Sequence, residues 1–290
     1  MHFTANPLHP VFVAELIGID FTRRLSAEQV AAVLDAMDRF AVCVVHHERA
    51  LSDEEHVAVS AQFGPMQRSQ VLKVAGVKPR LAHGEIIDQS NLDDLGNLYN
   101  EGDRRLLYKR ANRLWHTDMS FHPVRATYSL LSAHVIPPGG ADTEFTDMRA
   151  AYDALPTVMK ARIETLSAEH SYWYSRTLAG GPPASEEEQQ SRPPARHRLV
   201  HTHPRSGRKS LYLASHASHI PGMPIDEGRA LIAELTAFAT QPQFVFAYKW
   251  RVGDVLIWDN LCTMHRATPF DDTAHRRDVR RTTCREAEVD

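Results

Sequence analysis

This 290-residue sequence has few cysteines, no long apolar run and no strong excess of one charge. It has only three cysteines, and no pair of them has zinc-finger spacing, so we expect neither a disulfide framework nor a zinc finger. No apolar run approaches the roughly 18 residues of a membrane span. The formal net charge of -3 gives no electrostatic footprint for a nucleic acid. These absences predict a cytoplasmic protein with neither a nucleic-acid nor a membrane partner.

The hydrophobic content of 43% is enough to bury a large core, and we expect one enlarged domain over residues 1–290. Two segments interrupt its periodic pattern. Residues 67–113 mix charged side chains with glycines, and residues 180–198 are rich in proline and glutamate. Irregular segments of this length are typically functional lids or disordered, so we predict lid-like loops at both places. Within the first, His83 and Glu85 have metal-ligand spacing, but a solvated loop is the better interpretation because no strand pattern surrounds them.

Strand-like and helix-like stretches alternate along the remaining chain. Ser26 with Gln29, and Ser52 with Glu55, have the spacing of a capping box and predict two helix starts. Asp147 is a third expected helix cap, and a further helix should bury Leu231, Ile232, Leu235 and Phe238 on one face. Apolar or alternating runs predict strands at 11–20, 41–45, 126–136, 142–146, 199–203, 210–213, 244–248 and 255–258.

One strand-like stretch carries an imidazole and a carboxylate two residues apart. Side chains at i and i+2 of a strand point to the same face, so His116 and Asp118 can converge on one ion while Trp115 and Thr117 point away. Two histidines and one carboxylate form the facial triad of non-heme iron sites. His265, which follows the last predicted strand, is the candidate third ligand. With 17 histidines in the chain, its spacing alone would favour a structural role.

Two arginines after His265 strengthen the case for a ligand pocket. Arg276 and Arg280 lie four residues apart in a strand-like segment, so both guanidinium groups are expected to point inward. The same alternation predicts that Arg277 and Arg281 point outward. Two inward arginines require buried anions, because an unpaired buried charge is costly. A metal with a dicarboxylate cofactor and an acidic substrate would supply those anions.

Five motifs, occurring in matching order, resemble the taurine dioxygenase and 2,4-dichlorophenoxyacetate dioxygenase family over nearly the whole chain. They are Trp115-His116-Thr117-Asp118, residues 138–145, residues 202–209, residues 253–260 and Met264-His265-Arg266-Ala267. Members of this family depend on Fe(II) and 2-oxoglutarate. Residues 147–156 and 216–219 look closer to the aryloxyalkanoate branch than to the taurine branch.

The resemblance implies a mostly β fold with flanking helices, a double-stranded β-helix or cupin-like jelly roll. By position it implies that His116, Asp118 and His265 bind the iron. It implies that Thr143 and Arg276 hold the far carboxylate of 2-oxoglutarate and that Arg280 binds the acidic group of the substrate. His203 is a second candidate for that group, or else a strand histidine with a local partner. Trp115 and Trp258 flank metal motifs, where packing against the ligands is the expected role.

The implied reaction consumes 2-oxoglutarate and dioxygen at iron and releases succinate and carbon dioxide. On an aryloxyalkanoate, a small-molecule carboxylate, it hydroxylates the carbon next to the ether oxygen and gives a phenol and an oxo acid. Two alternatives stay open: a taurine or sulfonate dioxygenase that releases sulfite, and a non-catalytic jelly-roll binding protein. Members of the family are commonly oligomeric, so a homo-oligomer is expected.

Overall fold

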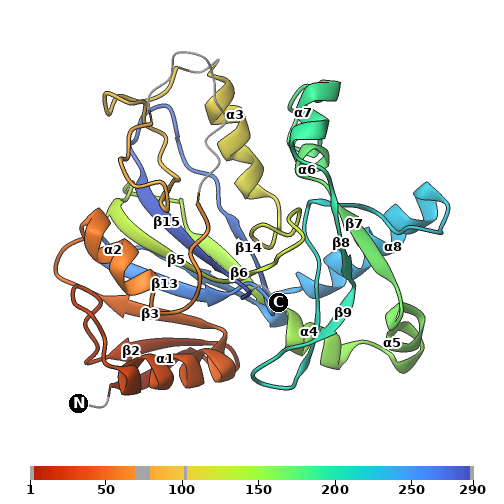
Figure 1. Cartoon of the computed structure of the whole chain (residues 1–290), viewed down its shortest axis with the longest axis horizontal. Helices are drawn as coiled ribbons and strands as arrows, with labels where there is room; N and C mark the ends of the chain where they lie inside the picture. The colour runs from red at the N-terminus through yellow and green to blue at the C-terminus, as the bar shows by residue number, and fades with distance from the viewer. Residues whose placement is uncertain (1–2, 69–78, 101–102, 288–290) are drawn as a thin grey trace.

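A seven-stranded mixed sheet occupies the left half of the molecule in the view of Figure 1. The computed structural model describes residues 3–68, 79–100 and 103–287. All pairings in this sheet are antiparallel except the parallel pair β2–β3. In spatial order its strands are β1 (Thr4–His9), β2 (Val13–Ile17), β3 (Val42–His46), β13 (Asp254–Asp259), β5 (Ala126–Val135), β15 (Asp278–Arg285) and β4 (Ile87–Asp88).

A three-stranded antiparallel sheet packs against one face of the large sheet. Its order is β12 (Val245–Tyr248), β6 (Thr143–Asp147) and β14 (Thr263–Ala267). One buried apolar cluster joins the two sheets, because Leu131, Leu256 and Val279 of the large sheet share it with Phe145 and Tyr248 of the small one. The two sheets therefore enclose a common core, and β14 carries His265 to its edge.

Two helices cover the opposite face of the large sheet. They are α1 (Ala27–Phe40) and α2 (Asp53–Ser60), and both begin with the capping boxes that the sequence predicts, at Ser26 and Ser52. Val33 and Val59 of these helices pack with Leu130 and Ile257 of the sheet. Strand alternation thus sends neighbouring residues of β5 and β13 into different cores.

The second half of the protein builds a separate apolar cluster from helices and short strands. The expected cap Asp147 accepts hydrogen bonds from the first turn of α4 (Met148–Ala154). In α8 (Ile225–Ala239), Leu231, Ile232 and Leu235 are buried as predicted, whereas Phe238 is only partly buried. The strands here are β7 (Ser167–His170), β8 (Ala195–Arg198), β9 (Val200–Thr202), β10 (Lys209–Leu211) and β11 (Ala217–His219). The helices are α4 (Met148–Ala154), α5 (Thr157–Ile163), α6 (Tyr172–Leu178), α7 (Glu186–Ser191), α8 (Ile225–Ala239) and the 3-10 helix η2 (Pro242–Phe244).

The two segments expected to be irregular contain regular structure. Within 67–113, the described residues form β4, α3 (Arg104–Arg110) and the 3-10 helix η1 (Ala111–Arg113), while 69–78 and 101–102 lie outside the described residues. Within 180–198, a capping box between Ser185 and Glu188 starts α7, and β8 pairs with β7. The prediction that 180–198 is an irregular, lid-like loop was wrong for α7 and β8, because it rested on composition and gave no weight to the capping box. No helix in the described part of the chain has the length and apolarity to cross a bilayer.

Candidate metal centre and ligand pocket

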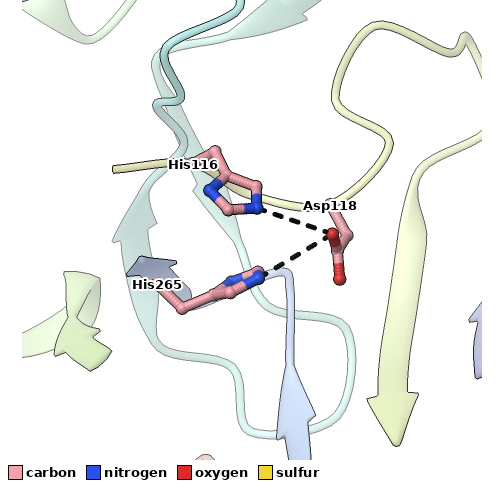
Figure 2. A group of neighbouring side chains, drawn as sticks. All are labelled: His116, Asp118 and His265. Atoms are coloured by element: carbon pink, nitrogen blue, oxygen red, sulfur yellow. Dashed lines mark ion pairs between the residues drawn. The ribbon is translucent and has the colours of Figure 1, made fainter. Parts of the chain in front are cut away.

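His116, Asp118 and His265 lie together, as the sequence predicts (Figure 2). His116 and His265 come from distant parts of the chain and pair through their backbones. The amide of His116 donates to the carbonyl of His265 over 3.0 Å, and the reverse bond measures 2.8 Å. This bridge holds the imidazole centroids 4.2 Å apart. Backbone pairing therefore fixes two of the candidate ligands relative to each other.

The carboxylate of Asp118 completes the group. Its Oδ1 lies 3.8 Å from Nε2 of His116 and 3.8 Å from Nε2 of His265. One ligand atom from each residue lies within 4.8 Å of the other two, and all three side chains are buried. Two nitrogens and one oxygen that converge from one side match the facial triad, which leaves other positions of a metal open.

The protonation states of the three residues suit a divalent cation. Nδ1 of His116 lies 2.8 Å from the carbonyl of Leu114, so it carries the proton and Nε2 keeps its lone pair. Burial lowers the pKa of His116 and holds that of His265 well below its ordinary value, which favours neutral imidazoles. Burial is the largest single effect on the pKa of Asp118 and raises it, but the charge of Arg281, the two neighbouring histidines and the hydrogen bond from Ser129 together outweigh burial, so the pKa is lowered. Neutral imidazoles and a charged carboxylate are the forms that bind metals.

A pocket opens beside the triad between the two sheets. Besides His116 and His265, its lining residues are Gln89, Asn112, Leu131, Thr143, Trp258, Ala267, Arg277, Val279 and Arg281. Thr143 is buried there, as expected of a ligand-binding hydroxyl, and its Oγ1 accepts a 3.0 Å hydrogen bond from the indole of Trp250. Trp258 packs on His265 with ring centroids 4.7 Å apart, which confirms the packing role predicted for this residue.

The predicted orientation of the arginines is wrong by one residue. Arg277 and Arg281 line the pocket, whereas Arg276 is exposed. The cause is the register in which β15 pairs with β5: Arg281 lies opposite the pocket residue Leu131, and Arg280 lies opposite Ser132. Because side chains alternate along a strand, a shift of one position moves every side chain to the other face.

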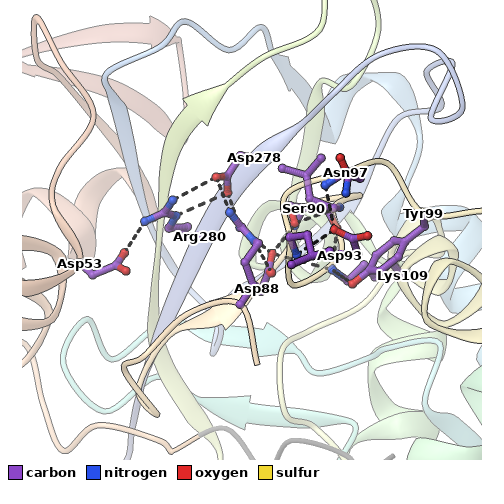
Figure 3. A network of polar contacts seen from close by, with 12 residues as sticks. Asp53, Asp88, Ser90, Asp93, Asn97, Tyr99, Lys109, Asp278 and Arg280 are labelled. Atoms are coloured by element: carbon purple, nitrogen blue, oxygen red, sulfur yellow. Dashed lines mark hydrogen bonds and ion pairs between the residues drawn. The ribbon is translucent and has the colours of Figure 1, made fainter. Parts of the chain in front are cut away.

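Arg280 points to the α2 side of the sheet and joins a charged network (Figure 3). Its Nη1 lies 2.7 Å from Oδ1 of Asp53, and its Nη2 lies 3.1 Å from Oδ2 of Asp278. Arg80 binds Asp278 at 2.8 Å and Asp88 at 2.8 Å, which ties the segment before β4 to β15. Arg280 is therefore neutralised by protein carboxylates away from the pocket, and the expected contact with a substrate is not available to it.

The two pocket arginines have different partners. Nη1 of Arg281 contacts Oδ1 of Asp118, the oxygen that faces both histidines. Nη1 of Arg277 reaches only the carbonyl of Gln89 at 3.4 Å, and its buried Nε has no hydrogen-bond partner within the described part of the chain. Burial lowers the pKa of Arg277 to about 10, so it stays charged at neutral pH. A buried cation with unused donors is suited to an anionic ligand.

Two amide side chains of the pocket were not predicted from the sequence. Nδ2 of Asn112 donates to Oε1 of Gln89 over 2.8 Å, and both residues line the pocket. Gln89 follows β4, and its backbone amide donates to the carbonyl of Val279 over 3.1 Å. Asn112 lies on the 3-10 helix directly before the metal motif, and that proximity was the one available signal.

His203 lies outside the pocket and has a local partner, the second of the two predicted alternatives. Its Nε2 is 2.7 Å from Oδ2 of Asp259, and its Nδ1 accepts a hydrogen bond from the amide of Ser206 at 3.1 Å. Cys262 lies close enough to His203 and Asp259 for the three side chains to form a candidate metal-binding group. However, Nε2 of His203 and Oδ2 of Asp259 already bond to each other. The pair stabilises the turn between β13 and β14, because Oδ1 of Asp259 also accepts a hydrogen bond from the backbone amide of Leu261.

We expect His203→Ala to destabilise the protein without changing its affinity for a carboxylate ligand. Loss of a buried hydrogen bond to a charged group costs roughly 1.5–3 kcal/mol in free energy of unfolding. Urea denaturation measures that loss, and the substrate KM should stay at the wild-type value. His275→Ala removes an exposed histidine and serves as the control, with an expected change within about 0.5 kcal/mol. A raised substrate KM with unchanged stability would indicate that His203 binds the substrate carboxylate.

Comparison with known proteins gives one consistent result. The model of the family described as taurine catabolism dioxygenase TauD, TfdA family matches residues 4–283. The alpha-ketoglutarate-dependent 2,4-dichlorophenoxyacetate dioxygenase of Cupriavidus pinatubonensis is 42% identical over 98% of both chains. The (S)-phenoxypropionate/alpha-ketoglutarate-dioxygenase of Sphingobium herbicidovorans is 34% identical over 94% of this chain and 92% of its own. The crystal structure of AAD-2 in complex with Mn(II) and N-oxalylglycine superposes with a TM-score of 0.94, at 42% identity and 99% coverage of both chains.

Proposed function

The chain belongs to the TauD, TfdA family and is an Fe(II)- and 2-oxoglutarate-dependent dioxygenase, and on that premise we propose that it hydroxylates aryloxyalkanoates such as 2,4-dichlorophenoxyacetate. The carbon next to the ether oxygen gains a hydroxyl group. The resulting hemiacetal collapses to a phenol and an oxo acid, while 2-oxoglutarate and dioxygen are converted to succinate and carbon dioxide. Relatives that act on 2,4-dichlorophenoxyacetate and on phenoxypropionate support this substrate class.

The observation that carries the proposal is a pocket with two arginines beside a group of three metal ligands. We assign His116, Asp118 and His265 to the iron. Bound iron supplies the redox chemistry that couples decarboxylation of 2-oxoglutarate to hydroxylation of the substrate. These three side chains would hold the iron through two nitrogens and one oxygen, a donor set that leaves other coordination positions for cosubstrate and oxygen.

We assign Arg277 and Thr143 to the far carboxylate of 2-oxoglutarate, in place of the expected pair with Arg276. Both line the pocket, and the planar guanidinium of Arg277 has donors available for a bidentate contact. The hydroxyl of Thr143 accepts one hydrogen bond from Trp250 and keeps its own proton to donate to a carboxylate. Water exclusion by the surrounding apolar side chains strengthens each of these contacts.

We assign Arg281 to the carboxylates next to the metal, the substrate acid group among them, in place of Arg280. Its Nη1 contacts Oδ1 of Asp118, one of the assigned ligand atoms, and this contact supports the assignment. Aromatic rings pack near His116: the ring centroid of His216 is 6.3 Å from that of His116, and that of Phe121 is 5.0 Å from that of His216. An arginine and aromatic rings close to the same candidate ligand are consistent with an aryl acid as substrate.

We further infer that the two packed sheets form a jelly roll within a single domain. The common core of the seven-stranded and three-stranded sheets, with the ligand group at one edge, supports this arrangement. The similarity to AAD-2 over 99% of both chains supports it as well. The pocket then lies at the open end, where a small substrate can enter.

Turnover of an aryl acid panel tests the substrate class. With Fe(II), ascorbate and 2-oxoglutarate, we expect 2,4-dichlorophenoxyacetate to give phenol, glyoxylate and succinate in equal amounts. Aryloxypropionates and taurine are the comparison substrates, with pyruvate and sulfite as their respective products. Sulfite release with no phenol would favour a sulfonate substrate. Absence of substrate-dependent succinate from every member of the panel would contradict the proposed substrate class.

A further inference from the structure

Ser129 and Asn260 form a buried hydrogen-bond network behind the carboxylate of Asp118. Ser129 lies on β5, and Asn260 follows β13, the neighbouring strand. Their side chains are 0% and 1% exposed, and Asp118 is 2% exposed. Neither Ser129 nor Asn260 lines the pocket, so both reach the carboxylate of Asp118 from the protein interior.

The first link joins Ser129 to the carboxylate. Oγ of Ser129 donates to Oδ2 of Asp118 over 2.7 Å, while Oδ1 is the oxygen that faces both histidines. The two oxygens of Asp118 therefore have separate roles. Because a bonded Oδ2 cannot rotate toward the ligand side without losing this hydrogen bond, Ser129 selects which oxygen is presented to a metal.

The second link fixes Ser129 itself. Nδ2 of Asn260 donates to Oγ of Ser129 over 2.9 Å, and Oδ1 of Asn260 accepts from the backbone amide of Asp118 at 3.3 Å. An amide nitrogen only donates and a carboxylate only accepts, so the hydroxyl of Ser129 must accept from Asn260 and give its single proton to Asp118. The direction of every bond in the chain is thereby determined.

The third link extends to the other side of the ligand group. Nε1 of Trp258 donates to the same Oδ1 of Asn260 over 3.1 Å, and the indole packs on the ring of His265. One amide thus orients Asp118 through its backbone and its carboxylate, and orients the ring that supports His265. All of its contacts match donor to acceptor, which is the condition for a rigid buried network.

We propose that Ser129 and Asn260 are positioning residues that hold Oδ1 of Asp118 toward the metal and thereby set the metal affinity of the enzyme. This inference rests on the proposed ligand triad. Neither residue is expected to touch the metal or a substrate. Residues that orient metal ligands typically change metal affinity by roughly 10- to 100-fold when they are replaced.

Ser129→Ala, measured by Mn(II) binding to the metal-free protein, tests the proposal. The concentration of free Mn(II) from its electron paramagnetic resonance signal gives the dissociation constant without any turnover. We expect binding to weaken roughly 10- to 100-fold. Asn260→Ala should weaken it over the same range, and the double variant should add little, because both side chains act through one network.

Ser132→Ala is a matched control. Ser132 lies three residues along the same strand on the opposite face, is 0% exposed, and its hydroxyl has no partner among the residues the structure describes. It should bind Mn(II) within threefold of wild type. Equal affinity of Ser129→Ala and wild type, or equal losses for Ser129→Ala and Ser132→Ala, would overturn the proposal. Failure of the wild type itself to bind Mn(II) would instead contradict the ligand triad.

Discussion

His265→Ala is expected to abolish tight binding of a divalent metal and to lower turnover of the aryl acid by roughly a thousandfold or more, since metal catalysis supplies several kcal/mol. Of the three proposed ligands, His265 alone comes from β14, and the other two lie on a single short segment. Two adjacent ligands cannot fix the geometry of a facial triad. Mn(II) binding and succinate formation should fall together.

His219→Ala provides the control for this experiment. His219 is a partly buried histidine of β11 that lies outside the pocket. Its replacement should leave the metal stoichiometry at one per chain and the turnover unchanged. Metal binding by His265→Ala at wild-type affinity would show that the triad of His116, Asp118 and His265 is not the metal site.

The parts of the fold that were predictable from sequence depend on local signals. The capping boxes at Ser26 and Ser52 use residues three positions apart, and both form in the structure. The order of strands in the large sheet has no such signal, because β13 inserts between β3 and β5 through contacts across most of the chain. Short-range chemistry predicts helix starts, whereas long-range packing determines the order of the sheet.

The candidate site was predictable to the extent that its geometry is local. The spacing of His116 and Asp118 predicted correctly that they converge, and the family motif adds His265. The strand predicted for this segment was wrong, because only His116 forms a β-bridge and Asp118 lies in a turn. Alternation implies that two arginines four apart share a face of a strand, but it cannot say which face points into the pocket, and the inward pair predicted from it, Arg276 and Arg280, was wrong. Which face of β15 points into the pocket is set by its register with β5, where Arg281 pairs with Leu131. This register cannot be predicted from the sequence of β15 alone.

The remaining residues in and behind the candidate site could not be predicted because their positions depend on tertiary contacts. Gln89 belongs to a segment without hydrophobic periodicity, and it reaches the pocket only because the residues around β4 pair with β15. Ser129 and Asn260 each have ordinary strand or turn sequences. Their role follows from the neighbouring positions of β5 and β13, which place a hydroxyl and an amide within 2.9 Å.

Arg277→Ala is expected to raise the KM for 2-oxoglutarate by roughly 30-fold or more, because loss of one partner of a buried charge pair costs about 2–5 kcal/mol. Arg276→Ala, at the adjacent exposed position, is a matched control and should leave that KM unchanged. The two variants remove the same kind of side chain at adjacent positions, so the comparison tests directly which of the two arginines binds 2-oxoglutarate. Initial rates of succinate formation at saturating aryl acid give both constants.

Arg277→Lys separates charge from shape at the same position. Lysine keeps the positive charge but lacks the planar fork that binds a carboxylate through two hydrogen bonds, so we expect a KM between those of the wild type and Arg277→Ala. A KM that rises in Arg276→Ala and not in Arg277→Ala would support the sequence prediction that Arg276, rather than Arg277, holds 2-oxoglutarate. Equal and small effects in both would mean that the far carboxylate of 2-oxoglutarate is held by other groups, and Thr143 would then be the first of those to replace.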